Sequence, residues 1–164
     1  MITVLNQGTR TIVWDKIRNL ISKDLDYYKF FIGSAKNISQ LGKEMGLEKV
    51  EFISESDNKI NGYFSYIYDS STRTAKDFEL LSLEKNSKNI TLLKDFAKVI
   101  RCIYDSPDYE RLEVEIIKGA PSSCILESLI RANSFRVVGE KRKAIRLNDN
   151  KLYDIVIYEH LKEE

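Results

Sequence analysis

The sequence predicts one α+β domain, and three features of the chain indicate this class. The first third carries helical periodicity, with apolar residues three and four positions apart. The middle changes to the period-two pattern of strands joined in an antiparallel meander. From residue 77 onward the chain reads as two strand–helix units followed by a hairpin. A length of 164 residues allows one continuous core, so we expect a single domain over residues 1–164.

Two helical segments are expected at the N-terminal side, and the second runs from Leu25 to Ile32. A further short helix is expected over Ile38 to Met45, where Gly46 would stop it. The first helix is marked by apolar residues at helical spacing: Ile12, Val13, Ile17, Leu20 and Ile21.

Strands follow these helices. Val50 to Ile53 predicts one strand, and Ile60 to Tyr68 predicts its antiparallel partner across a turn at Asp57 to Lys59. The later elements are expected as a strand over Asp77–Glu84 with a helix over Thr91–Asp105, a strand over Arg111–Ile117 with a helix over Ser122–Asn133, and a hairpin of Phe135–Leu147 with Leu152–Glu159.

The composition is that of an ordinary globular protein. Hydrophobic residues make up 43% and charged residues 31% of the sequence, and the formal net charge is +1. This combination argues against intrinsic disorder. The small net charge gives no long-range attraction to nucleic acid, and no apolar run approaches the roughly 20 residues of a membrane span. We expect neither nucleic acid nor a membrane as partner.

The cysteines and the N-terminal residues predict the compartment. Cys102 and Cys124 lie in predicted helices and lack the CxxC or CxxxH spacing of a zinc site. Residues 1–10 lack the basic and apolar regions of a secretory signal. We therefore expect no bound metal, no disulfide framework and a reducing cytoplasm.

Taken in order, these elements resemble the GNAT acyltransferase superfamily. Three local matches carry the resemblance. Asn61 to Phe64 resembles the "xxGyxx" third strand of the family, and Phe78 to Leu83 resembles its fourth strand. Ile125 to Phe135 resembles the "VLEKLGF" exit of the last core helix, with Ser134 in place of the usual glycine.

The resemblance implies an α+β fold (α/β sandwich) with a mixed, mostly antiparallel six- to seven-stranded sheet and helices on both faces. It covers residues 48–160 well and the N-terminal third loosely. A first strand is expected in Ile2 to Leu5.

The same resemblance implies acetyl-CoA as cofactor. Its signature, Arg/Gln-x-x-Gly-x-Gly/Ala, falls on Glu84 to Asn89, where every named position is substituted. Free N–H groups and the dipole of a helix N-terminus bind phosphate without requiring glycine. A solvated loop with an Asn or Ser helix cap is the alternative for these residues. The implied cofactor-binding residues are Leu81, Ser82, Leu83, Lys85, Ser87, Lys88, Asn89, Ile90, Thr91 and Ser123.

Two glutamates and a tyrosine are the candidate catalytic residues. Glu79 is the first choice of general base because it lies on the fourth strand, near the site where the resemblance implies that the sheet splays, and Glu115 on the next strand is the second. Each is also compatible with a surface carboxylate on an alternating strand. Ile130 occupies the family's usual position for an acid tyrosine, so Tyr109 is taken as a substitute. Other tyrosines remain open for that role: Tyr63, Tyr66 and Tyr153.

The resemblance implies an N-acetyltransferase that transfers an acetyl group from acetyl-CoA to a primary amine of a small molecule or peptide by direct attack. The alternative is a GNAT-like module that has lost turnover and serves in CoA sensing or protein binding. Tyr153 and Tyr158, taken as exposed aromatics, permit a homodimer. Nucleic-acid binding is a third, disfavoured hypothesis based on hairpin residues: Arg136, Lys141, Arg142, Lys143 and Arg146.

Overall fold

The computed structural model describes residues 1–5, 7–25, 28–30, 46–57, 59–83, 89–120 and 123–162. Its seven strands form one mixed sheet in the order β1-β2-β3-β4-β5-β7-β6. Neighbouring strands are antiparallel except β4 and β5, which are parallel. The strands are β1 (Ile2–Val4), β2 (Leu47–Ser56), β3 (Lys59–Asp69), β4 (Thr74–Ser82), β5 (Arg111–Ile117), β6 (Arg136–Arg146) and β7 (Leu152–Leu161).

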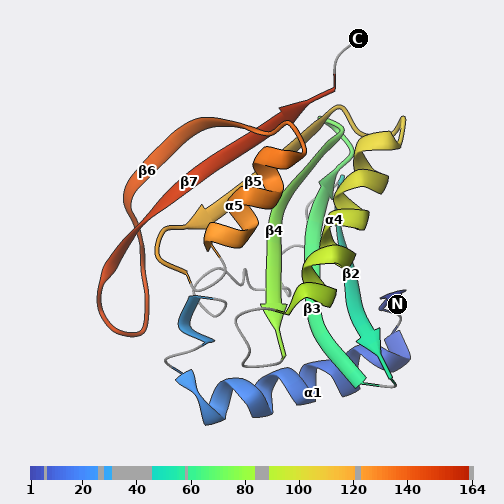
Figure 1. The fold of residues 1–164 in the computed structure, drawn as a ribbon, viewed down its shortest axis with the longest axis vertical. Coiled ribbons are helices and arrows are strands. Elements are labelled where there is room, and N and C mark those ends of the chain that lie inside the picture. Colours follow the sequence, from blue (N-terminus) through green and yellow to red (C-terminus); the bar gives the residue numbers. More distant parts are fainter. Residues whose placement is uncertain are drawn as a thin grey trace.

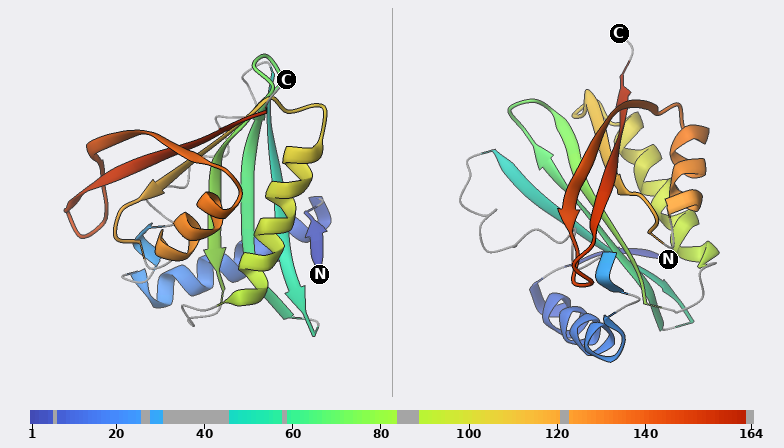
Figure 2. Two further views of the ribbon diagram at one scale, coloured as in Figure 1. Left: turned by 45° about the horizontal axis from the view of Figure 1, so that its top comes forward. Right: turned by 90° about the vertical axis from the view of Figure 1, so that its left-hand side faces the viewer.

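Helices cover both faces of this sheet (Figures 1 and 2). Helices α4 (Ile90–Asp105) and α5 (Ser123–Ala132) lie on one face, and α1 (Gln7–Lys23) lies on the other. Neighbouring residues of a strand point to opposite faces, so Phe64 packs in the cluster under α4 while Tyr63 packs in the cluster under α1. The fold predicted from the sequence is confirmed, including the first strand.

The larger core lies between the sheet and α4. One face of α4 is buried there, and its apolar residues recur at helical spacing. Gly62 of β3 allows this helix to approach closely, because a Cβ at that position would lie 2.5 Å from a side-chain carbon of Leu92. The buried apolar residues of α4 are Leu92, Phe96, Val99, Ile100 and Ile103.

Strands β4 and β5 pair over only part of their length, at Thr74 with Arg111 and Ala75 with Leu112. Beyond Ala75 they diverge, as Figure 1 shows for the green and yellow strands. A bulge follows in β4, where Lys76 to Glu79 lies opposite only Ser65 to Ile67 of β3. Within it Asp77 has a φ of 54°, which is uncommon for a residue with a side chain. The bulge bends β4, and the sheet splits next to it.

Two expectations from the sequence are corrected by the structure, and a third concerns residues that it does not describe. The strand expected from Asp77 begins at Thr74, because β4 pairs with β3 before the bulge as well as after it. Tyr158 was expected to be exposed, which is wrong: it is 1% exposed and packs in the core under α4. Tyr153 is half-buried. The short helix expected over Ile38 to Met45 lies outside the described residues.

Candidate functional site

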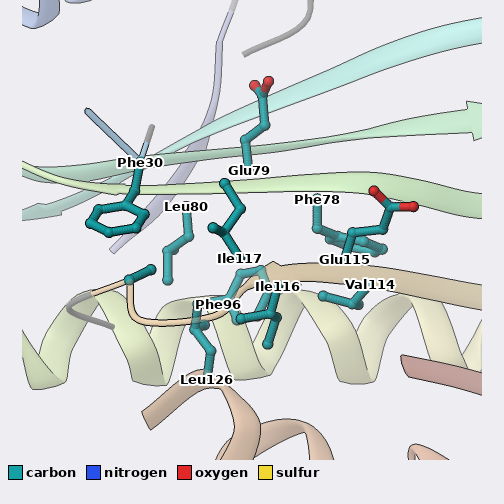
Figure 3. Close-up of a pocket in the computed structure, with 11 residues that line it drawn as sticks. Phe30, Phe78, Glu79, Leu80, Phe96, Val114, Glu115, Ile116, Ile117 and Leu126 are labelled. Carbon is teal, nitrogen blue, oxygen red and sulfur yellow. The ribbon is translucent and has the colours of Figure 1, made fainter. Parts of the chain in front are cut away.

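A pocket opens where β4 and β5 diverge (Figure 3). Its volume is about 80 Å³, and most of its wall is apolar. It passes between the two strands, since it is lined both by residues that face α4 and by residues that face the opposite side. The lining residues are Phe30, Phe78, Glu79, Leu80, Phe96, Val114, Glu115, Ile116, Ile117, Ala120 and Leu126.

The two glutamates predicted from the sequence both line this pocket. Glu79 comes from β4 and Glu115 from β5, and in Figure 3 both carboxylates lie on the side of the strands away from α4. Their position follows from strand alternation, because Phe78 and Leu80 on either side of Glu79 face the helix. The structure therefore brings two acidic groups to the two edges of one apolar slot.

Glu79 is a buried carboxylate, and one of its two oxygens is hydrogen-bonded on its own sheet face. It is 6% exposed, and its Oε2 accepts hydrogen bonds from Lys49 Nζ (3.0 Å) and Ser65 Oγ (2.9 Å). Ser65 is its direct cross-strand neighbour in β3. A carboxylate is rarely buried unless it is paired, and the ion pair with Lys49 supplies that partner.

Glu115 has a matching lysine on the other side of the split. Its Oε1 accepts from Lys141 Nζ of β6, and its side chain is more exposed than that of Glu79. This hydrogen bond raises the pKa of Lys141 above its ordinary value, so the lysine is charged at neutral pH. Neither lysine comes from a strand that borders the split. Lys49 lies on β2, beyond β3, and Lys141 lies on β6, beyond β7.

A second buried polar pair lies further along the same sheet face. Tyr63 donates to Glu51 Oε1 (2.9 Å), and Arg10 of α1 pairs with the other oxygen of Glu51. Burial raises the pKa of Tyr63 well above its ordinary range, so its hydroxyl stays protonated and is directed at Glu51. Tyr63 does not line the pocket.

The third predicted catalytic residue, Tyr109, is not brought together with the glutamates. It lies just before β5, beside the end of the sheet where β4 and β5 still pair. Its hydroxyl is 2.9 Å from that of Tyr66, and it does not line the pocket. Burial raises the pKa of both tyrosines. Tyr153 is also outside the lining, although its ring contacts Phe30.

Asn89 is the N-cap of α4. Its Oδ1 accepts from the backbone N–H of Leu92 (3.1 Å), and its Nδ2 donates to Asn61 O (2.9 Å) and Ser82 Oγ (3.1 Å). This is the capping role that the sequence left open as the alternative to cofactor binding. Asn89 thus ties the start of α4 to β3 and to the end of β4.

The other predicted cofactor-binding residues are only partly described. Leu81 and Ser82 end β4, and the backbone N–H of Leu83 donates to Asn61 O (2.9 Å). Within the described chain, no acceptor meets the N–H groups of Ile90 and Thr91 in the first turn of α4. Ser123 is buried at the start of α5. The remaining three lie outside the described residues: Lys85, Ser87 and Lys88.

Sequence reasoning missed three residues that shape the site. Lys49 and Ser65 hold Glu79, and Phe30 lines the pocket. Ser65 could have been found from the sequence, because it is a polar residue in the middle of a strand that is otherwise mostly apolar. Phe30 had no comparable signal, because residues 28–30 reach the pocket from a distant part of the chain.

Among the residues with described positions, no group of three or more histidine, cysteine, aspartate or glutamate side chains is placed to hold a metal ion. Over the same part of the chain, no helix is both long enough and apolar enough to cross a membrane.

Comparison with solved structures gives matches over nearly the whole chain. A ribosomal L7/L12 α-N-protein acetyltransferase, RimL, in complex with coenzyme A has a TM-score of 0.70 at 12% identity, covering 98% of this chain and 92% of its own. Spermidine N-acetyltransferase from Vibrio cholerae, in complex with CoA and spermine, has a TM-score of 0.68 at 12% identity and covers 99% and 95%.

A third solved structure is the microcin C7 self-immunity acetyltransferase MccE in complex with acetyl-CoA and AMP. Its TM-score is 0.66 at 20% identity, over 98% of this chain and 92% of that one. No family model and no curated protein sequence matches the chain. With its split sheet and the strand order given above, the chain has the fold of the GNAT N-acetyltransferases.

Proposed function

We propose that the protein is an acetyl-CoA-dependent N-acetyltransferase that acts on a primary amine of a small molecule or peptide. The observation that carries the proposal is the pair Glu79 and Glu115 at an apolar slot between diverging strands. Structures with the same fold hold CoA or acetyl-CoA, which supports the choice of cofactor.

The proposed cofactor site combines the slot with the start of α4. The thioester end of acetyl-CoA would lie in the slot, and the N–H groups of Ile90 and Thr91 would face its pyrophosphate. β4 has no paired strand on its β5 side beyond Ala75, so backbone N–H groups directed into the split can polarise the thioester carbonyl. Preorganised donors of this kind stabilise the oxyanion that forms when the amine attacks.

Glu79 is the proposed general base. An amine enters as an ammonium ion, which the two carboxylates attract, and Glu79 accepts its proton. The neutral nitrogen then forms a bond to the thioester carbon, and the carbon–sulfur bond breaks. CoA leaves as the thiolate and takes up the second proton that the attacking nitrogen loses, and the amide product carries the acetyl group. Glu115 would hold the ammonium from the other edge of the slot.

A CoA-sensing or protein-binding module is the second candidate. Asn89 favours it, because its side chain already occupies the N–H of Leu92 at the helix start. The apolar Ile130 favours it as well, since this position carries no proton donor. Ile130 weakens turnover and leaves CoA binding intact, whereas the occupied N–H of Leu92 weakens CoA binding itself.

Thermal unfolding with ligands tests both candidates. The protein is heated with acetyl-CoA, with CoA and with CoA that lacks its 3′-phosphate. Binding to the folded state alone raises the unfolding temperature by mass action. No shift at millimolar concentration would exclude both candidates. A shift without acetylation of any member of an amine panel would favour the module.

A further inference from the structure

One end of the pocket has an apolar wall next to Glu79. Phe30, Leu80 and Ile117 form it, and Figure 3 shows the Phe30 ring beside Leu80 at the end of the slot away from Glu115. Phe30 reaches the pocket from helical residues 28–30, which lie beside the tip of the β6–β7 hairpin (Figure 2).

The hairpin holds Phe30 in place through a defined set of contacts. The ring of Tyr153 meets the Phe30 ring edge to face, with centroids 5.3 Å apart and planes at 76°. Asp149 Oδ2 accepts from Lys29 Nζ (2.8 Å) and from the Tyr153 hydroxyl (2.6 Å). Lys29 Nζ also lies 5.3 Å from the centroid of the Phe30 ring. The Tyr153 ring and the Lys29 ammonium beside Phe30 are both hydrogen-bonded to Asp149, and these contacts position the Phe30 ring.

The charges beside this wall neutralise each other. Asp149 is paired with Lys29, and its second oxygen accepts from the backbone N–H of Lys151 (3.1 Å). The lysine and tyrosine hydrogen bonds hold the pKa of Asp149 below its ordinary range, so this carboxylate is ionised and already compensated. Among the described residues, the wall itself consists of Phe30, Leu80 and Ile117, which carry no carboxylate, and Asp149 does not line the pocket.

On the basis of the proposed function, we infer that the acceptor is a primary monoamine with an apolar or aromatic body and that Phe30 determines this specificity. The single ammonium lies between Glu79 and Glu115, and the body of the molecule lies against Phe30 and Ile117. A second ammonium would lose its water at this wall and gain no partner among the residues whose positions are described, which is unfavourable. Diamines and polyamines are therefore poor acceptors.

Steady-state acetylation of paired amines tests the inference. Hexylamine and phenethylamine are compared with 1,5-diaminopentane in wild-type protein and in the variants Phe30→Ala and Phe30→Leu. In wild type, kcat/KM for the monoamines exceeds that for the diamine by about tenfold or more. Phe30→Ala raises KM for the monoamines and reduces this preference to about threefold or less, with KM for acetyl-CoA unchanged. Phe30→Leu restores most of the preference.

Leu152→Ala is the matched control, and Tyr153→Phe is a second, milder variant. Tyr153→Phe keeps the ring against Phe30 and removes the hydroxyl, which interacts with Asp149 and Lys29, so it causes a smaller loss of preference. It also gives a second test if Phe30→Ala does not fold. Leu152 is exposed and outside the pocket, and its substitution leaves the preference unchanged.

The outcomes separate the inference from the proposed function. Preferred acetylation of 1,5-diaminopentane by wild type, or an equal effect of Phe30→Ala on all three amines, overturns the inference and leaves an acetyltransferase. Acetyl-CoA binding without acetylation of any amine overturns both.

Discussion

Glu79 and Glu115 lie on adjacent parallel strands, on one face of the sheet, and line the pocket that opens beyond the last paired residues of β4 and β5. Each is hydrogen-bonded to a lysine from a strand further out in the sheet. The two differ in burial: Glu79 is enclosed, whereas Glu115 is partly open to solvent. This difference fits the two proposed roles, in which Glu79 accepts the proton and Glu115 holds the ammonium.

Glu79→Gln is expected to lower kcat by about 100-fold or more, because glutamine keeps the shape of the side chain but cannot accept the proton of the ammonium. The Kd for acetyl-CoA should not change. Stopped-time acetylation assays and calorimetric titration measure the two quantities. Glu113→Gln is the control, since Glu113 lies on the neighbouring strand β5, pairs with Arg111 and does not line the pocket. Equal losses in both variants would contradict a base at Glu79.

Lys49→Met is expected to lower the free energy of unfolding by about 3 kcal/mol, because it leaves the buried Glu79 carboxylate without its partner. Adding Glu79→Leu to this variant should recover most of the loss, since no buried charge then remains. Urea denaturation followed by circular dichroism measures both changes. If the double variant is no more stable than Lys49→Met, the unpaired Glu79 carboxylate is not the cause of the lost stability.

Asn89→Gly tests the helix start. Loss of the cap and of the hydrogen bonds from its amide group should reduce the free energy of unfolding by about 1–2 kcal/mol. The same change frees the N–H of Leu92, so acetyl-CoA should bind more tightly. Chemical denaturation and calorimetric titration are the two measurements. Asn89→Ser, which keeps a cap, is the control, and unchanged or weaker binding by the glycine variant would contradict a phosphate site here.

Asp149→Asn is expected to lower the unfolding temperature at pH 7 and to have less effect in acid. The pKa of Asp149 is depressed in the folded protein by Lys29 and Tyr153, so the unfolded chain binds the proton more readily. The stabilisation is complete above the ordinary pKa of 3.8 and is lost as the pH falls below it. Melting curves from pH 7 to pH 2.5 should show the wild type and the variant converging.

Asp15→Asn is the control for that series, since Asp15 is an exposed residue of α1 in an i,i+3 pair. Its unfolding temperature should follow wild type throughout. A constant difference between wild type and Asp149→Asn across the whole pH range would show that shape, not charge, is responsible.

The sequence by itself determined the elements, their order and the two acidic candidates. Apolar spacing along α4 and alternation along β5 are local properties, and the structure has these elements within one residue of the predicted bounds. The alternation of side chains along a strand also assigned Glu79 to one face of β4 and Glu115 to one face of β5. A homodimer and a cytoplasmic location stay predictions.

The tertiary structure decided how these pieces become a site. The split between β4 and β5 lies beside a bulge at Asp77, which no local pattern announced. Phe30 reaches the pocket because contacts with Tyr153 and Asp149, more than a hundred residues away, hold its segment there. Long-range pairing also buried Tyr158, which alternation alone could not orient toward the core. Periodicity records which residues share a face, whereas contacts between distant segments decide what each face meets.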